Sequence, residues 1–260
     1  MKFAYLNGSK TEATKGAQGF CPVCFAPVIA KCGIHRIHHW AHKSNNSCDP
    51  WWENETAWHR NWKNLFPEQW QEKVFVNAQT GERHIADVVT PHTPYNLVIE
   101  FQHSHISSEE RQSREAFYTQ ENRRMMWVVD GSRLKNDYKR FLNNFNCCNK
   151  LGKGIFRIIE PTKIFNNAWC SSSVPVIFDF GEEFVQKEKI ENILFCLLPQ
   201  KFQNNSSVFI GLSRKEFVNF VTDGTILNRI YSLLNPTPLK FFITPSMQLY
   251  RYQHARKRRF

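Results

Sequence analysis

The chain has 260 residues, of which 42% are hydrophobic and 22% are charged. These proportions are ordinary for a water-soluble globular protein with a sizeable buried core. No run of about eighteen uninterrupted apolar residues occurs, so we expect no transmembrane helix and no membrane partner. The short apolar run after Met1 ends at Asn7, which is too early for a secretory leader and favours a cytoplasmic protein.

The formal net charge of +11 is unevenly distributed. Residues 1–130 contain 14 Lys and Arg against 14 Asp and Glu, whereas residues 131–260 contain 20 against 9. A basic half beside a neutral one predicts a polyanionic partner, most simply DNA. The alternative is a solvated basic surface that binds nothing in particular. The cationic tail, residues 251–260, could equally hold phosphates or serve as a solubilising end.

Residues 1–50 are rich in Cys and His and have little hydrophobic periodicity, so a metal would help to stabilise them. Cys21 and Cys24 form a CxxC knuckle, which supplies two ligands of a tetrahedral Zn²⁺ site from one tight turn. The redox reading of this motif lacks the βαβ context that it needs. We therefore predict a structural zinc element here, with DNA docking as a secondary role. The other two ligands are sought among three residues: His39, His42 and Cys48.

Residues 51–131 alternate strong helix and strand signals, and Pro67 and Gly81 mark ends and turns. Ser107, followed by Glu110 three places later, has the spacing of a capping box. The predicted elements, in chain order, are a helix over 53–66, strands over 71–76, 84–89 and 97–102, a helix over 107–124 and a strand over 125–131.

Two acidic residues stand among apolar neighbours on adjacent predicted strands. Glu100 shares one strand face with Gln102, because the two are separated by two positions. Asp87 is flanked by apolar residues on the preceding strand. Carboxylates in such positions are costly to bury unless they are paired or bind a cation, and Mg²⁺ prefers such oxygen ligands. The alternative is a structural network in which both acids pair with Arg83 or Arg114.

The predicted helix 53–66 carries a second set of polar residues. Glu55, His59 and Lys63 are spaced at i, i+4 and i+8, so they would line one stripe of the helix. This pattern fits either an exposed salt-bridged face or a site in which His59 transfers protons near neutral pH. Trp58 and Trp62 form a separate stripe that could pack on the sheet.

These motifs together carry a resemblance to a known family. In chain order they are Glu55-x3-His59-x3-Lys63, Ala86-Asp87-Val88, Ile99-Glu100-Phe101-Gln102-x-Ser104 and Arg114-x2-Phe117-Tyr118. They resemble the nuclease domain of competence protein CoiA-like proteins, within the PD-(D/E)xK nuclease superfamily. The resemblance implies an α/β (α+β) fold with a restriction-endonuclease-like αβββαβ core.

The resemblance also implies chemical roles. Asp87 and Glu100 would bind a catalytic Mg²⁺ or Mn²⁺, and Glu55 would assist from the first helix. Gln102 occupies the position that is lysine in the usual superfamily motif. Glutamine cannot carry the charge of that lysine, and Lys63 is a candidate substitute cation.

Two further sets of residues are assigned by the same resemblance. Arg114 and Tyr118 look like helix residues that support the site or contact phosphate. The segment from His39 to His42 looks like the His-aromatic-Ala-His element that follows the knuckle, which favours both histidines as zinc ligands. Cys48 stays open as an alternative ligand.

We expect three parts along the chain: a zinc-binding element over 1–50, a PD-(D/E)xK nuclease core over 51–131 and a basic accessory α+β region over 132–260. In the last part, residues 174–180 are predicted to form a strand, and Ser213 is predicted to open a capping box with Glu216. The four cysteines after residue 131 are expected to be buried thiols.

The sequence thus predicts a Mg²⁺-dependent deoxyribonuclease of the CoiA-like type, acting in DNA uptake, processing or defence. A second hypothesis is a zinc-containing DNA-binding accessory protein without turnover, for which Gln102 is the motive. A third and weaker one is a zinc-stabilised protein-interaction module. The sequence leaves the oligomeric state open, a homo-oligomer included.

Overall fold

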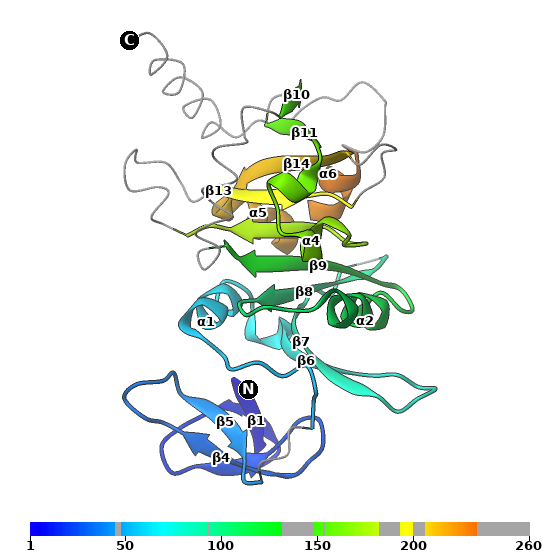
Figure 1. The fold of residues 1–260 in the computed structure, drawn as a ribbon. Coiled ribbons are helices and arrows are strands. Elements are labelled where there is room, and N and C mark those ends of the chain that lie inside the picture. Colours follow the sequence, from blue (N-terminus) through cyan, green and yellow to red (C-terminus); the bar gives the residue numbers. More distant parts are fainter. Residues whose placement is uncertain are drawn as a thin grey trace. The chain divides into compact units, whose positions relative to one another are not determined.

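A computed structural model describes residues 1–44, 48–92, 94–131, 148–152, 154–181, 193–199 and 206–232 (Figure 1). The chain has a mixed α+β architecture and divides into two compact units, residues 1–104 and residues 105–260. The three predicted parts, with boundaries at residues 50 and 131, stay a prediction. The tail 251–260 lies outside the described residues.

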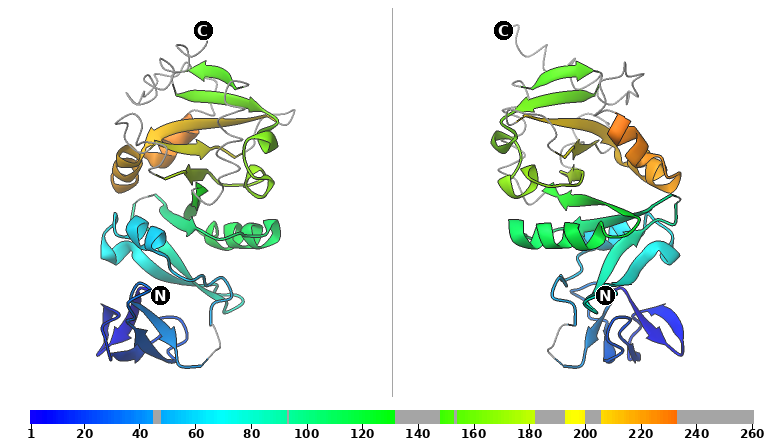
Figure 2. Two further views of the ribbon diagram at one scale, coloured as in Figure 1. Left: turned by 60° about the vertical axis from the view of Figure 1, so that its left-hand side comes forward. Right: turned by 90° about the vertical axis from the view of Figure 1, so that its right-hand side faces the viewer.

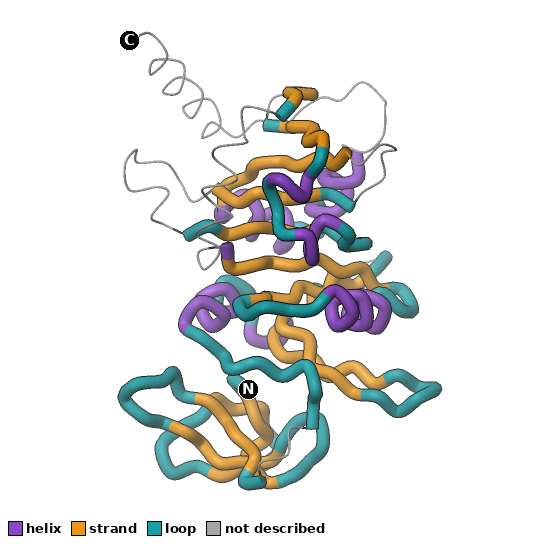
Figure 3. The backbone as a smooth tube through the Cα atoms, in the orientation of Figure 1, coloured by secondary structure: helices purple, strands orange, loops and turns teal. Residues whose placement is uncertain are grey.

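The first unit begins with a small antiparallel sheet in the strand order β2-β1-β3-β4-β5 (Figure 3). Its strands are β1 (Phe3–Leu6), β2 (Ser9–Glu12), β3 (Gln18–Phe20), β4 (Pro27–Lys31) and β5 (His39–His42). The inner face buries Ala4, Val28 and Trp40 together with Cys21, and partly buried Val74 and Ile85 pack against this cluster. These strands are too short to show a clear alternation of apolar residues, so the sequence did not predict them.

A helix and three antiparallel strands complete the first unit. They are α1 (Ala57–Lys63), β6 (Gln71–Val76), β7 (Arg83–Val89) and β8 (Asn96–Gln102), with the 3₁₀ turn η1 (Glu68–Trp70) before β6. All three predicted strands are confirmed to within one residue. The predicted stripe of Trp58 and Trp62 packs on the sheet, where the Trp62 ring stacks on Phe101 at 5.7 Å between centroids.

The predicted helix over 53–66 is shorter than expected. The Thr56 side chain accepts the N–H of His59 and caps the helix, so residues 53–56 lie outside it. The C-cap is Asn64, three residues before Pro67. A Thr N-cap satisfies one of the free N–H groups at a helix start and sets where the helix begins.

The second unit contains a sheet in the order β10-β11-β14-β13-β12-β9, in which only the β9–β12 pair is parallel among the described strands. Figure 2 shows α5 and α6 on one face of this sheet and α4 on the other. The elements are α2 (Ser108–Tyr118), β9 (Arg123–Asp130), β10 (Asn149–Gly152), β11 (Ile155–Ile159), η4 (Pro161–Lys163), α4 (Asn167–Cys170), β12 (Val176–Asp179), β13 (Ile193–Leu197), β14 (Ser206–Ser213), α5 (Arg214–Thr222) and α6 (Ile226–Ser232).

Two capping predictions in this unit can be compared with the structure. Ser213 and Glu216 form the predicted capping box at the start of α5. Ser107 caps α2 by accepting the N–H of Glu110. However, α2 ends at Tyr118 rather than near residue 124, with Thr119 as its C-cap, and β9 already begins at Arg123. None of the described helices has the length and apolar character that a membrane crossing requires.

Candidate active site and metal centre

Asp87 and Glu100 lie opposite one another on β7 and β8. Val88 is paired with Ile99, and this register places Asp87 directly across from Glu100, so both side chains leave the same face of the sheet. The Asp87 N–H donates to Oε1 of Glu100, and the Phe101 N–H donates to Oδ2 of Asp87, both at 3.0 Å. In a regular sheet these two backbone N–H groups would donate to backbone carbonyl oxygens. Here they donate to side-chain carboxylates, so the regular backbone hydrogen bonding between strands is interrupted at Asp87 and Glu100.

Lys63 lies at the centre of an acidic cluster beside this pair. Its Nζ is 2.7 Å from Oε1 of Glu55, 2.9 Å from Oε1 of Glu72 and 3.7 Å from Oδ1 of Asp87. Burial disfavours the ammonium, but Glu72, Glu55 and Asp87 outweigh it and raise the pKa of Lys63 above its ordinary value. Lys63 is therefore a permanent internal cation next to Asp87.

Glu55 stands just before α1, not on the predicted helical stripe, yet it still reaches Lys63. Arg60 holds the same carboxylate with two bonds, from Nε at 2.9 Å and from Nη2 at 2.8 Å. Burial acts to raise the pKa of Glu55, but Lys63 and Arg60 overcome it, and the pKa falls below its ordinary value. Glu55 is consequently a charged anchor for the two cations of the helix.

Glu72 was missed by the sequence analysis and is a main contact of Lys63. It has a left-handed φ of 46°. Its neighbours Gln71 and Lys73 pair with Val88 and Ala86, so the position across from Glu72 is Asp87. Its carboxylate accepts the N–H groups of Lys2 at 2.7 Å and Phe3 at 3.0 Å. Glu72 thus links β1 of the small sheet to the cluster.

His59 is held at both ring nitrogens. Nε2 lies 2.6 Å from the carbonyl oxygen of Phe101, so this nitrogen carries the hydrogen and donates it. Nδ1 is 3.1 Å from Oγ1 of Thr56, which can donate to it. Burial lowers the pKa of His59 below its ordinary value, despite the neighbouring carboxylates of Asp87 and Glu53. The imidazole is therefore neutral near pH 7 and fixes α1 to β8; its predicted role in proton transfer stays a prediction.

Gln102 has one orphaned polar atom. Its Nε2 donates to Oε1 of Glu53 and, at 3.1 Å, to the carbonyl oxygen of Ser104. Both partners are acceptors, so the orientation of the amide is determined. The side chain is 1% exposed, and its Oε1 has no hydrogen-bond partner among the described residues. A buried acceptor left without a partner costs about 1–3 kcal/mol, which indicates that a water or a cation completes this position.

The donor set around Asp87 fits a hard divalent cation. Asp87 and Glu100 are opposed on neighbouring strands, and Gln102, two positions after Glu100 on β8, has a buried amide oxygen without a hydrogen-bond partner among the described residues. Burial raises the pKa of Asp87 against the opposing effects of Lys63 and His59, while 23% of its side chain stays accessible. Mg²⁺ commonly takes one or two carboxylates and completes its shell with water and substrate phosphate.

The alternative prediction was that Asp87 and Glu100 pair with Arg83 or Arg114. For Arg83 the structure shows a different partner. Nη1 of Arg83 donates to the carbonyl oxygen of Val23 at 3.0 Å, and the ion pair of Asp87 is made with Lys63. Arg114 pairs with Glu110 through Nε at 3.1 Å and Nη2 at 2.5 Å. Arg114 and the buried Tyr118 belong to the second unit, and their predicted roles stay predictions.

A second cluster lies in the small sheet. Among the described residues, one group of at least three Cys, His, Asp or Glu residues brings its ligand atoms within 4.8 Å of one another: Cys21, Cys24, His42 and Cys48. The Sγ atoms of Cys21 and Cys48 are 3.6 Å apart, and Sγ of Cys24 is 3.3 Å from Nε2 of His42. Tetrahedral Zn²⁺ with ligands at about 2.0–2.3 Å needs separations of roughly 3.5–3.8 Å. Three sulfurs and one nitrogen therefore fit structural zinc.

His39, which the resemblance favoured as a ligand, is outside this cluster, and the alternative Cys48 takes its place. His39 and His42 both lie on β5 and are three positions apart. Side chains at an odd spacing on a strand point to opposite faces, so one cation cannot readily bind both. Nδ1 of His39 instead lies 2.9 Å from the carbonyl oxygen of Ile37.

Hydrogen bonds connect the neighbourhood of the zinc cluster (Cys21, Cys24, His42 and Cys48) to β7. Arg83 at the start of β7 bonds to Val23, inside the CxxC knuckle. Asp49, the residue after Cys48, accepts the N–H of Ile85 at 3.1 Å and contacts His84. Asp49 was not predicted, and only its position next to a candidate ligand could have drawn attention to it.

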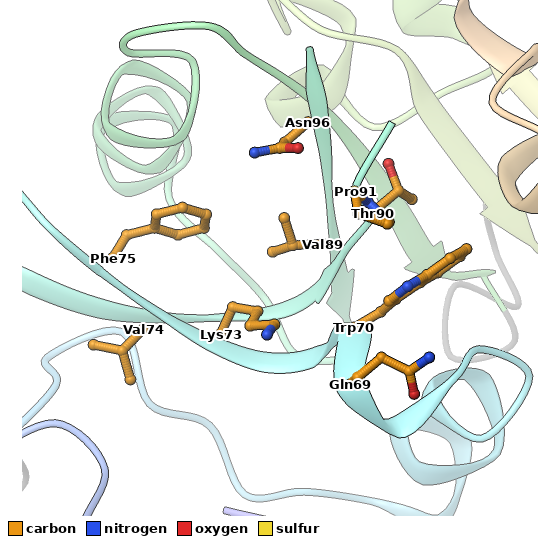
Figure 4. A pocket seen from close by; sticks show the side chains of 9 residues that line it. All are labelled: Gln69, Trp70, Lys73, Val74, Phe75, Val89, Thr90, Pro91 and Asn96. Carbon is orange, nitrogen blue, oxygen red and sulfur yellow. The ribbon is translucent and has the colours of Figure 1, made fainter. Parts of the chain in front are cut away.

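A cavity of about 500 Å³ lies elsewhere in the first unit, beside β6 and β7. Figure 4 shows Phe75, Val89 and Asn96 around it, with Trp70 and Lys73 at its border. None of the predicted site residues lines it, so it is separate from the Asp87–Glu100 pair.

Two family comparisons match the chain over these sites. "Competence protein CoiA, N-terminal domain" matches residues 6–50, and "Competence protein CoiA, nuclease-like domain" matches residues 55–150. The chain belongs to the competence protein CoiA family. The CoiA N-terminal domain spans the four members of the zinc cluster, and the CoiA nuclease-like domain spans Glu55, Lys63, Asp87 and Glu100.

A curated relative in the same family is "Competence protein CoiA" from Bacillus subtilis (strain 168). It is 29% identical over 149 residues, which cover 54% of this chain and 38% of the relative. The matched region thus spans well under half of that protein's length. No solved structure matches the chain.

Proposed function

We propose that this chain is a metal-dependent DNA nuclease that hydrolyses phosphodiesters through a PD-(D/E)xK core, acting in DNA uptake, processing or defence. The observation that carries the proposal is the opposed pair of Asp87 and Glu100, which accept backbone N–H groups at 3.0 Å and present oxygens on one face. Membership of a family with a nuclease-like domain supports the same reaction class.

Asp87 and Glu100 would hold Mg²⁺ or Mn²⁺, and Gln102 would offer its amide oxygen to the ion or to the attacking water. When bound, the ion would orient the phosphate, favour deprotonation of water and neutralise charge on the leaving oxygen. The amide of Gln102 is locked by Glu53 and Ser104. This fixed acceptor would position a water for attack without the positive charge that lysine supplies in the usual motif.

Lys63 and Glu55 would act as positioning residues. Lys63 is bound by Glu55 and Glu72 and lies 3.7 Å from Asp87, so its charge orients the Asp87 carboxylate. Because the Lys63 ammonium already contacts three carboxylates, it is poorly placed to contact a phosphate as well. Zn²⁺ at Cys21, Cys24, His42 and Cys48 would have a structural role, because four protein ligands leave no open position for chemistry.

The test is cleavage of plasmid and single-stranded DNA by the purified chain with Mg²⁺ or Mn²⁺. We expect cleavage that is lost in Asp87→Asn and in Glu100→Gln. Glu68→Gln, which changes an exposed acid of the first unit, is a control and should retain activity. Unchanged cleavage by both site variants would refute the proposed mechanism.

A second candidate is a DNA-binding accessory protein that retains the nuclease-like domain without turnover. It is favoured by Gln102 in place of lysine and by the commitment of Lys63 to Glu55 and Glu72. In that case neither Mg²⁺ nor Mn²⁺ would give cleavage, while the affinity for DNA would fall steeply with salt.

A further inference from the structure

The small sheet of the first unit is strongly basic. Residues 1–44 contain six Lys and Arg and one Asp or Glu, a net of +5, whereas residues 45–130 contain eight against thirteen, a net of −5. The neutral balance of the first 130 residues therefore conceals two opposite charges. The basic excess belongs to the zinc-containing sheet, and in the first unit residues 45–104, which include the candidate active site, contain four Lys and Arg against eight Asp and Glu.

The cations of this sheet are mostly uncompensated. Its one acid, Glu12, is bound by Lys2 and Arg60. Lys31 and Lys43 are exposed on β4 and just after β5, and no carboxylate among the described residues forms an ion pair with either. Their charge is available to a polyanion.

Two exposed aromatic rings lie side by side on the outer face of the same sheet. Tyr5 on β1 and Phe20 on β3 are register partners, so they leave the same face with Cβ atoms about 5 Å apart. They are 38% and 54% exposed, although burying an aromatic ring is ordinarily favourable. The inner face, with Ala4 and Trp40, is filled by the core, so the rings are not needed to close it.

We propose that the outer face of β1 and β3 binds single-stranded DNA, with Tyr5 and Phe20 stacking on bases and Lys31 and Lys43 contacting phosphates. Proteins bind single strands by combining a cationic track with aromatic rings, because every unpaired base offers a face for stacking. In a duplex those faces are occupied by neighbouring bases, so paired DNA cannot use the rings. The proposal rests on DNA as the substrate of the proposed nuclease.

The experiment measures binding of a fluorescent 20-nucleotide single strand by anisotropy, without added Mg²⁺. The aromatic variant is Tyr5→Ser/Phe20→Ser, and the matched control is Trp52→Ser, a comparably exposed ring outside residues 1–44 (44% exposed). We expect the dissociation constant to rise at least about tenfold for the aromatic variant and to stay within about twofold for the control. Wild-type affinity in the aromatic variant would overturn the proposal.

The second variant is Lys31→Ala/Lys43→Ala. Both side chains are exposed, so this variant leaves the core intact and keeps the proposal testable if the aromatic variant fails to fold. The slope of log affinity against log salt should become shallower by about 1.4, since each phosphate contact on a single strand contributes roughly 0.7. Duplex DNA and single-stranded RNA of the same sequence are the comparison ligands. An equal loss of duplex binding in the aromatic variant, or a preference for RNA, would overturn the assignment to single-stranded DNA.

This outcome is separable from that of the proposed nuclease. Asp87→Asn should abolish cleavage and leave single-strand affinity unchanged, because Asp87 belongs to the acidic part of the unit. If Asp87→Asn stops cleavage and the aromatic variant still binds like wild type, the nuclease stands and the binding face is refuted. If wild type binds but does not cleave, the binding face stands alone.

Discussion

Oδ1 of Asp49 lies 2.8 Å from Nδ1 of His84, which places the residue after Cys48 against the strand that carries Asp87. Nε2 of His84 is 2.8 Å from Oε1 of Glu82, so each ring nitrogen faces a carboxylate oxygen. The ring also stacks on Trp51, with centroids 3.3 Å apart. This buried contact connects the zinc cluster to β7, three residues before Asp87.

Asp49→Asn should therefore weaken both the fold and the metal-dependent activity. The Asp49 carboxylate accepts the Ile85 N–H and contacts His84, and a hydrogen bond to a charged group contributes about 1.5–3 kcal/mol. Glu82→Gln is the matched control: it changes the other partner of His84, whose side chain is 48% exposed, and should cost about 1 kcal/mol or less. Urea unfolding of both variants measures the difference in the free energy of unfolding. Equal destabilisation would show that the buried Asp49–His84 contact contributes no more than the exposed Glu82 contact.

Replacement of Lys63 should be strongly destabilising. Lys63→Met leaves Glu55, Glu72 and Asp87 without their shared cation, although Arg60 still holds Glu55. We expect a loss of about 3–5 kcal/mol in the free energy of unfolding. Lys63→Arg keeps the charge and should recover part of this loss, as measured by thermal or urea unfolding. A Met variant as stable as wild type would mean that the acids are protonated rather than paired.

Stability should be constant near neutral pH and fall on both sides. Burial lowers the pKa of His59 below its ordinary 6.5, so below pH 6.5 the unfolded state binds a proton that the folded state does not, and stability declines. The pKa of Glu55 is also lowered, from 4.5, and its contribution is lost as the pH falls further. The raised pKa of Lys63 adds stability that is complete below 10.5 and is lost only at higher pH.

Urea unfolding from pH 4 to pH 12 checks these signs. His59→Gln keeps a polar side chain and removes the titration, so its stability should change less than that of wild type between pH 6.5 and pH 5. A wild-type stability that increases on acidification through this range would contradict the buried, neutral state of His59.

The strands of the nuclease-like part could be predicted because their signals are local. Alternating apolar residues and the turn at Gly81 located β6 and β7, and capping chemistry located the starts of α2 and α5. The choice of Asp87 and Glu100 as partners followed from the same periodicity. Whether they act on DNA did not follow from it.

The remaining features depend on tertiary structure. The exclusion of His39 follows from strand parity on β5, and β5 is too short to recognise in the sequence. Glu72 acquires its role through a left-handed backbone and through the N–H groups of Lys2 and Phe3, about seventy positions earlier. Contacts between residues so far apart in the sequence leave no local sequence pattern from which they could be predicted.

Gln102→Met should separate stability from chemistry. Methionine fills a similar volume, removes the orphaned Oε1 and loses the hydrogen bonds to Glu53 and Ser104. Because Glu53 is partly accessible, water can replace the hydrogen bond that Glu53 loses. The free energy of unfolding should therefore fall by only about 1 kcal/mol. Cleavage with Mg²⁺ should nevertheless fall by about 10²-fold, since the acceptor that positions water or metal is gone. Gln102→Asn, which keeps both the amide oxygen and the amide donor that faces Glu53, should retain more activity than Gln102→Met in the same assay. If the Met and Asn variants lost activity equally while remaining folded, the acceptor role of this side chain would be excluded.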